Sequence, residues 1–156
     1  MSFSLTRKTD YALIALAALA REKRDESGEM LSAREIAERH DLPQSLLMNA
    51  LKELHRAGII ASRRGAGGGY FLDHHPSRIT IREVIEAMEG GVSVTICCDE
   101  HTQSPAELCQ IAVNCPISDP MQKFNHLLNN FLSQITLETL INSDSVFAVP
   151  FMGVNV

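Results

Sequence analysis

The sequence predicts a mainly α-helical chain with one small β-hairpin and a long C-terminal helix. Apolar residues recur at helical spacing in several segments, two Ser/Thr-x-x-Glu capping boxes mark helix starts, and a glycine-rich turn separates two short apolar stretches. Of the 156 residues, 45% are apolar and 21% are charged, which is the composition of a globular protein and argues against global disorder.

The first two helices are expected before residue 41. Residues 6–20 form the first, because apolar side chains repeat there at helical spacing and alanine, the best helix former, is abundant. Residues 21–29 are polar and contain Gly28, so we expect a loop. The second helix begins at the capping box of Ser32 and Glu35, whose hydroxyl and carboxylate each satisfy a backbone amide, and it ends near His40.

A third helix is expected over residues 43–57. Pro43 suits the first helical position because its missing N–H costs nothing there, and Gly58 is a typical C-terminal cap. One face of this helix is apolar and is predicted to be buried: Leu47, Ala50, Leu51 and Leu54. Side chains on or beside the opposite face can reach outwards: Gln44, Ser45, Met48, Asn49, Lys52 and Arg56.

A hairpin and a fourth helix follow. Residues 59–62 and 69–72 are the predicted strands, and they flank the turn Arg63-Arg64-Gly65-Ala66-Gly67-Gly68. A second capping box, formed by Thr80 and Glu83, begins a helix with an apolar stripe, and Gly90-Gly91 ends it.

The C-terminal part is predicted to contain an irregular segment and one long helix. Residues 92–118 show no regular period, and Asp119-Pro120 is expected to cap and begin a helix that reaches about residue 141. At 1.5 Å per residue this helix would be about 33 Å long. It has a wide apolar face and few charges, so we expect a homodimerisation helix over residues 119–142. The apolar tail, residues 143–156, has no clear role.

Two short helices joined by a tight turn and followed by a hairpin are typical of a winged helix-turn-helix, here residues 1–90. Residues 1–80 carry 12 Lys/Arg against 10 Asp/Glu, whereas residues 81–156 carry 2 against 9, which suits a DNA reader joined to a second module. The expected partner is double-stranded DNA with a palindromic operator. The predicted DNA contacts are Ser32, Gln44, Ser45, Met48, Asn49, Lys52, Arg56, Arg63, Arg64, Gly65 and Gly67.

Other classes of protein fit less well. The first residues are not those of a signal peptide, and no stretch reaches 18 uninterrupted apolar residues, so we expect a cytoplasmic protein without a membrane span. The sequence has no GxGxxG or HExxH motif, and its glycine run lacks the lysine and Ser/Thr of a P-loop. We therefore expect neither an enzyme nor a small-molecule substrate.

All four cysteines fall in the segment 91–118, which we predict to be a cluster-binding loop. Thiolates are the ligands of iron–sulfur clusters, and the spacing is not the paired CxxC of a zinc ribbon. Because Cys97 and Cys98 are adjacent, we favour Cys98, Cys109 and Cys115 as ligands, with Cys97 as the alternative to Cys98. A cluster-free thiol switch, in which Cys109 and Cys115 pair under oxidation, is the other interpretation.

Three segments carry a family resemblance: LTRKTDYAL, RAGIIASRRGAGGGYFL and ITIREVIEAMEG. The chain resembles the Rrf family of winged-helix regulators, with IscR-, NsrR- and RirA-like members, over about residues 5–142, and is most similar to the regulators of SUF iron–sulfur assembly operons. The resemblance implies a repressor of cluster-assembly genes, with nitric oxide, iron or redox sensing as alternatives. Relatives usually carry an aromatic and an acidic residue where Leu46 and Met48 stand, so no operator preference carries over.

The resemblance also bears on the ligands. Cluster-binding members use three cysteines in this region, and the five-residue gap between Cys109 and Cys115 matches IscR-like relatives, although the ten-residue gap after Cys98 is longer. Ser118 stands where those relatives have a histidine. Asp10 occupies the position of an aspartate that NsrR-like members supply from the partner subunit, which implies a fourth ligand and favours a 4Fe–4S over a 2Fe–2S cluster. The alternative for Asp10 is an exposed carboxylate stabilised by the helix dipole.

Overall fold

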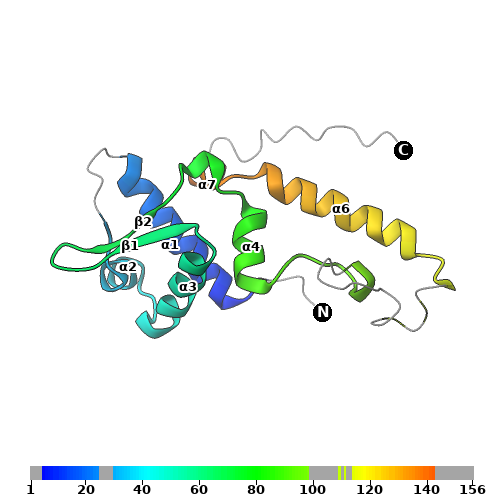
Figure 1. Ribbon diagram of the computed structural model, residues 1–156, viewed down its shortest axis with the longest axis horizontal. Coiled ribbons are helices and arrows are strands. Elements are labelled where there is room, and N and C mark those ends of the chain that lie inside the picture. The colour runs from blue at the N-terminus through cyan, green and yellow to red at the C-terminus, as the bar shows by residue number, and fades with distance from the viewer. Residues whose placement is uncertain (1–4, 25–29, 99–108, 110, 112–113, 143–156) are drawn as a thin grey trace.

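The computed structural model describes the chain apart from residues 1–4, 25–29, 99–108, 110, 112–113 and 143–156, and it has the predicted mixture of helices and one hairpin (Figure 1). Thirteen of the 28 residues of the predicted cysteine loop, and the whole predicted tail, lie outside the described residues. The elements in chain order are α1 (Arg7–Arg24), α2 (Ala33–His40), α3 (Gln44–Arg56), β1 (Ile60–Arg63), β2 (Gly69–Leu72), the short 3-10 helix η1 (Pro76–Arg78), α4 (Ile81–Glu89), the 3-10 helix η2 (Ile96–Cys98), α6 (Ser118–Gln134) and α7 (Leu137–Ile141).

Helix α1 is the central element of the half that the sequence predicts to bind DNA. It contacts α3, α4, β2 and α7, and it buries an alanine-rich face around the fully buried Leu16. Small side chains at these positions let neighbouring helices approach closely, so one helix can serve several partners. The predicted end of this helix was too early, because residues 21–24 are good helix formers and continue it. Glu22 in that extension forms an ion pair with Arg39 of α2.

The predicted helix-turn-helix is confirmed. Ser32 and Glu35 form the expected capping box at α2, and Asp41 ends that helix in a left-handed conformation with φ 53°. Leu47, Ala50, Leu51 and Leu54 of α3 are all buried, as their spacing predicts. Pro43 precedes α3 as its N-cap instead of forming its first residue.

The wing is a two-stranded antiparallel hairpin in which Ile60 pairs with Leu72 and Arg63 pairs with Gly69. Its first strand begins and ends one residue later than predicted. A backbone bridge between Leu31 and Tyr70, with N–O distances of 3.1 and 2.8 Å, attaches the wing to the start of α2. The hairpin and the helix-turn-helix therefore form one packed unit.

The prediction of a single C-terminal helix is wrong. Helix α6 ends at Gln134, Ile135 is extended, and Thr136 caps the separate helix α7. The break allows backbone pairing with the start of α4: the Ile81 N–H donates to the Ile135 carbonyl at 2.8 Å, and the Leu137 N–H donates to the Ile79 carbonyl at 2.8 Å. Leu137, only 1% exposed, then packs into the core of the predicted DNA-binding half.

Helix α6 projects away from this core (Figure 1). It has 17 residues, which corresponds to about 26 Å instead of the predicted 33 Å. The segment after α4 lies against α6 through η2. No helix in the described part of the chain is long and apolar enough to cross a membrane.

Candidate DNA interface and cysteine site

The outer face of α3 carries most of the side chains predicted to read DNA. Gln44, Ser45, Asn49, Lys52 and Arg56 are exposed, as the helical spacing requires. Met48 differs, because its side chain is half-buried and packs against the core. The guanidinium of Arg56 donates to the Glu53 carboxylate at 3.1 Å, so this arginine is already paired within α3.

The tip of the wing exposes Arg63 and Arg64 beside the glycines. Gly65 and Gly67 have φ angles of 109° and 74°, a region that side chains other than glycine rarely adopt. The turn closes through a hydrogen bond from the Gly68 N–H to the Gly65 carbonyl at 2.9 Å. These glycines therefore define a tight tip from which two guanidinium groups can reach phosphates.

Gly69 has a different function, which sequence reasoning missed. A Cβ atom on this residue would lie 2.7 Å from the carbonyl carbon and oxygen of Leu31. Only glycine allows the backbone of β2 to approach the start of α2 so closely. The glycine-rich sequence thus lets the wing pack against the start of α2, and it also gives a ligand access to the tip of the wing.

Ser32 lies between the wing contact at Leu31 and helix α2, and its side chain caps that helix. Its hydroxyl accepts the Glu35 N–H at 3.2 Å, and its own N–H donates to the Glu35 carboxylate at 2.7 Å. Hydrogen bonds from the Ser32 side chain and backbone hold the pKa of Glu35 below its ordinary value. The Ser32 side chain therefore caps α2, and its predicted contact with DNA stays a prediction.

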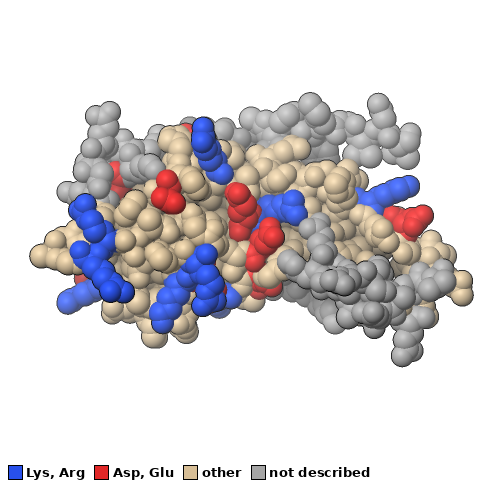
Figure 2. All heavy atoms as spheres, in the orientation of Figure 1, with Lys and Arg blue, Asp and Glu red and all other residues tan. Residues whose placement is uncertain are grey.

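The basic side chains are unevenly distributed over the surface. Figure 2 shows most of the Lys and Arg of this view over the half of the molecule formed by the wing, α2 and α3, with acidic groups in the middle and at both ends. Such a concentration of positive charge attracts the phosphate backbone of DNA. We call this part of the surface, which carries the exposed Lys52, Arg56, Arg63 and Arg64 of α3 and the wing, the basic face.

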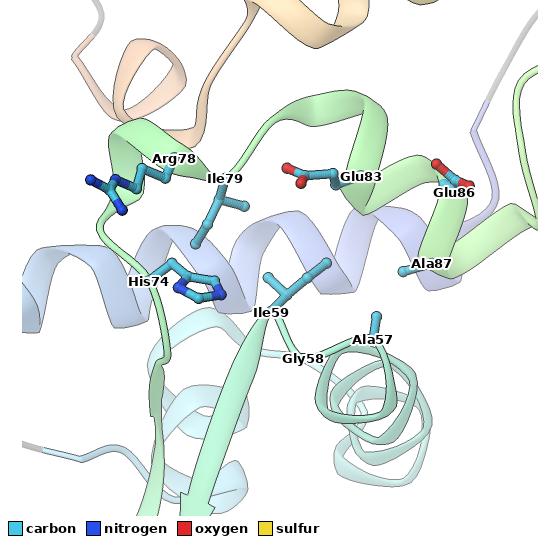
Figure 3. A pocket seen from close by; sticks show the side chains of 9 residues that line it. All are labelled: Ala57, Gly58, Ile59, His74, Arg78, Ile79, Glu83, Glu86 and Ala87. Carbon is cyan, nitrogen blue, oxygen red and sulfur yellow. The ribbon is translucent and has the colours of Figure 1, made fainter.

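A cavity of about 350 Å³ lies behind the C-terminal end of α3 (Figure 3). Glu83 and Glu86 of α4 line it together with His74 and Arg78, above the apolar Ile59 and Ile79. Glu83 is already used by the α4 capping box, where it accepts the Thr80 N–H at 2.7 Å. The cavity lies beside the contact between α3, the predicted recognition helix, and α4.

The cysteine site begins at η2. Cys98 is 7% exposed, whereas Cys97, Cys109 and Cys115 are half-buried, and all four thiols are free. The Thr95 hydroxyl donates to the Cys98 sulfur at 3.1 Å and lies 3.2 Å from the Cys97 sulfur. The described residues do not bring three His, Cys, Asp or Glu side chains close enough together to hold a metal ion.

The cysteine segment is attached to α6 by two asparagines that sequence reasoning missed. Asn125 and Asn129 are 5% and 3% exposed, and both bond to backbone groups between Val92 and Cys98. Their spacing of four residues places them on one face of α6, and this spacing is the only trace of the pair in the sequence, which does not show that the amides are buried.

Asp10 lies in the first turn of α1, where its side chain is 45% exposed. Its carboxylate is 3.8 Å from the Arg7 guanidinium, a weak surface pair. The same turn is fixed by Glu89 at the end of α4, whose carboxylate accepts the Thr6 N–H at 3.1 Å and the hydroxyls of Thr6 and Thr9. Sequence reasoning missed Glu89, because its partners lie 80 or more residues away.

The pKa of Glu89 reflects these contacts. Burial by itself would raise it, but the hydrogen bonds from Thr9 and Thr6 and the charge of Lys8 outweigh burial and lower it. The carboxylate form is thus the one that holds α1 to α4. These two helices carry the two predicted ligand regions, Asp10 at the start of α1 and the cysteine segment just after α4.

Comparison with known proteins identifies the family. Residues 5–143 match the Rrf2 family, described as iron-dependent transcriptional regulators. The HTH-type transcriptional regulator IscR of Yersinia enterocolitica is 32% identical over 145 residues, covering 93% of this chain and 83% of that protein. An rrf2-like HTH-type regulator of Rhodobacter capsulatus is 31% identical over 137 residues, covering 88% and 91%.

Two solved structures have the same fold. CymR, the global cysteine regulator of B. subtilis, superposes with a TM-score of 0.68 at 25% identity, over 91% of this chain and 98% of that one. T. potens IscR superposes with a TM-score of 0.64 at 25% identity, over 98% and 96%. The fold, the basic face and these relatives agree with the predicted winged helix-turn-helix and with a regulator that is not an enzyme. The chain belongs to the Rrf2 family of winged-helix DNA-binding transcription regulators.

Proposed function

We propose that this regulator is a homodimer whose binding to a palindromic operator depends on an iron–sulfur cluster held by Cys98, Cys109 and Cys115. The observation that carries the proposal is the environment of Cys98: its sulfur accepts a hydroxyl hydrogen bond, the residue is buried, and its backbone carbonyl accepts a hydrogen bond from Asn125 of the proposed dimer helix α6. Hydrogen-bonded sulfur in a sheltered position is typical of cluster ligands, whose second shell tunes the metal.

The exposed apolar face of α6 supports the dimer. Phe124, Leu127 and Phe131 are 53%, 50% and 41% exposed, and their spacing places them along one side of the helix. A second copy related by two-fold symmetry would cover this stripe and present two copies of α3 to the two halves of an operator. The wing of each copy would then contact the flanking phosphates through Arg63 and Arg64.

The donor set fits an iron–sulfur cluster in its chemistry, because three thiolates of one segment are soft, anionic ligands. Asp10 of the partner subunit would be the fourth ligand, which favours a 4Fe–4S cluster. A bound cluster would supply a group that oxidants, nitric oxide or iron shortage can alter. We propose repression of iron–sulfur assembly genes as the outcome, as the similarity to IscR suggests.

Anaerobic purification followed by iron and sulfide analysis tests the proposal. The wild type and the Cys97→Ala variant should be brown, whereas Cys98→Ala, Cys109→Ala and Cys115→Ala should each lose colour and iron. Asp10→Ala should shorten the lifetime of the cluster in air, and Asp119→Ala, also in the first turn of a helix, is the matched control. A colourless wild type after anaerobic reconstitution with iron and sulfide would contradict the cluster.

The second candidate is a cluster-free thiol switch, favoured by the four free thiols. In that case Cys109 and Cys115 would pair under oxidation, and the half-burial of both leaves room for an oxidant to reach them. This function predicts a colourless protein whose affinity for DNA changes with reductant, and Cys109→Ser would abolish the change.

A further inference from the structure

We propose that Thr95, Asn125 and Asn129 form a polar clamp that fixes the Cys98 sulfur on helix α6, so that chemical change at this sulfur moves the helix. The inference deepens the proposed function and rests on it, because it assigns Cys98 a sensing role. These three residues do not ligate the cluster themselves; they position the residue that does.

The two asparagines are the unusual feature of α6. They are its only buried residues, on a helix whose apolar Phe124, Leu127 and Phe131 are exposed. Burying an amide side chain is unfavourable unless it is hydrogen-bonded, so a buried Asn pair indicates a specific partner. That partner is the backbone of the segment that leads from α4 to Cys98.

Together the two amide groups bond to backbone groups along this segment. The Asn125 side-chain oxygen accepts the Val94 N–H at 3.0 Å, and its nitrogen donates to the Cys98 carbonyl at 3.4 Å. The Asn129 nitrogen donates to the Val92 carbonyl at 3.0 Å and to the Asn125 carbonyl at 3.0 Å. One helical face thus holds the segment at three points, including the residue that carries the buried sulfur.

Thr95 extends the clamp to the sulfur atom itself. The Cys98 N–H donates to the Thr95 carbonyl at 2.9 Å, which closes the turn of η2. The Thr95 hydroxyl then donates to the Cys98 sulfur at 3.1 Å. The sulfur is therefore bonded to a turn whose neighbouring backbone groups, the Val94 N–H and the Cys98 carbonyl, bond to Asn125 of α6.

The clamp and the proposed dimer face occupy opposite sides of the same helix. With 3.6 residues per turn, Asn125 and Asn129 point to one side of α6, and the stripe of Phe124, Leu127 and Phe131 points away from it. A change in the position of Cys98 would therefore be transmitted to the dimer contact instead of being absorbed by the loop.

Alkylation of the cysteines in the reduced, metal-free full-length chain tests the clamp. Iodoacetamide is applied at one fixed pH, and mass spectrometry follows each cysteine separately. In Asn125→Ala, which removes two hydrogen bonds, Cys98 should react about tenfold faster because the segment opens more often. Cys109 and Cys115 in the same sample should keep their wild-type rates.

Asn130→Ala is the matched control, because this neighbouring asparagine is exposed. It should leave the reactivity of Cys98 unchanged. Circular dichroism shows whether Asn125→Ala is folded like the wild type. If it is, and Cys98 is still alkylated at the wild-type rate, the clamp is wrong, whether or not the protein holds a cluster.

A second readout separates positioning from simple packing. In the cluster-loaded protein, Thr95→Val should lower the reduction potential, because a donor to a ligand sulfur stabilises the reduced cluster, and Thr95→Ser should keep the wild-type value. Equal potentials in all three proteins would remove Thr95 from the clamp. A failure of the proposed function would show instead as a colourless wild type with the alkylation pattern intact.

Discussion

Replacing Glu89 by alanine removes the carboxylate that ties the end of α4 to the start of α1. Two effects contribute to the loss of stability. The Thr6 N–H and hydroxyl lose an acceptor at 3.1 and 2.7 Å, which resembles the loss of a helix cap and costs about 1 kcal/mol. The fully buried Thr9 hydroxyl loses its charged acceptor, which costs about 1 kcal/mol more.

The expected loss is therefore about 2 kcal/mol, or about 4–8 °C in the melting temperature of a chain this long. Urea unfolding at a fixed protein concentration measures it, because a dimer makes stability depend on concentration. Glu86→Ala is the matched control, since Glu86 is an exposed carboxylate on the same helix. A Glu89→Ala variant within about 0.5 kcal/mol of this control would refute the reasoning.

The pH dependence of the stability of a second variant, Glu89→Gln, gives an independent check. The folded state lowers the pKa of Glu89, so the contact contributes fully above the ordinary pKa of a glutamate and is lost as the pH falls through the lower, folded value. The difference in stability between wild type and Glu89→Gln should therefore shrink in acid. A difference that stays constant between neutral pH and about pH 3 would contradict the assignment.

Three further predictions concern the wing, the DNA face and the dimer. Gly69→Ala should destabilise the protein by about 1–3 kcal/mol in urea unfolding, because its new Cβ would lie 2.7 Å from backbone atoms; a neutral effect would mean that the wing is not docked as described. Arg63→Ala should weaken DNA binding in fluorescence anisotropy and reduce the log–log salt slope by about 0.9, whereas Lys123→Ala on α6 should change neither. Phe131→Asp should sediment as a monomer while Asn130→Asp stays dimeric, and a dimeric Phe131→Asp would exclude the α6 stripe from the interface.

Local sequence signals predicted much of the fold. The capping boxes at Ser32 and Thr80 lie where the helices begin, because the partners of each box are three residues apart and need no tertiary context. The buried face of α3 follows from helical spacing alone. The wing was recognisable from its glycines and the apolar residues on either side.

The features that the sequence did not predict share a cause: each depends on contacts with residues far away along the chain. The break at Ile135 exists because residues 135–137 pair with residues 79–81, and nothing in the local apolar pattern reports that pairing. Asn125 and Asn129 are buried because they bond to residues 92–98, a segment in which the sequence shows no regular period. Glu89 looked like an ordinary surface charge until the fold placed Thr6 and Thr9 beside it.

The most direct test of the central claim is the affinity for operator DNA with and without the cluster. An operator selected from random sequence by the anaerobic protein is titrated with cluster-loaded protein, with the same protein after cluster removal by a chelator, and with Cys98→Ser, all at one salt concentration. We predict that loading changes the affinity by at least about tenfold, as expected of allosteric coupling, and that Cys98→Ser matches the cluster-free wild type. Equal affinities for the loaded and cluster-free wild type would contradict cluster-dependent regulation.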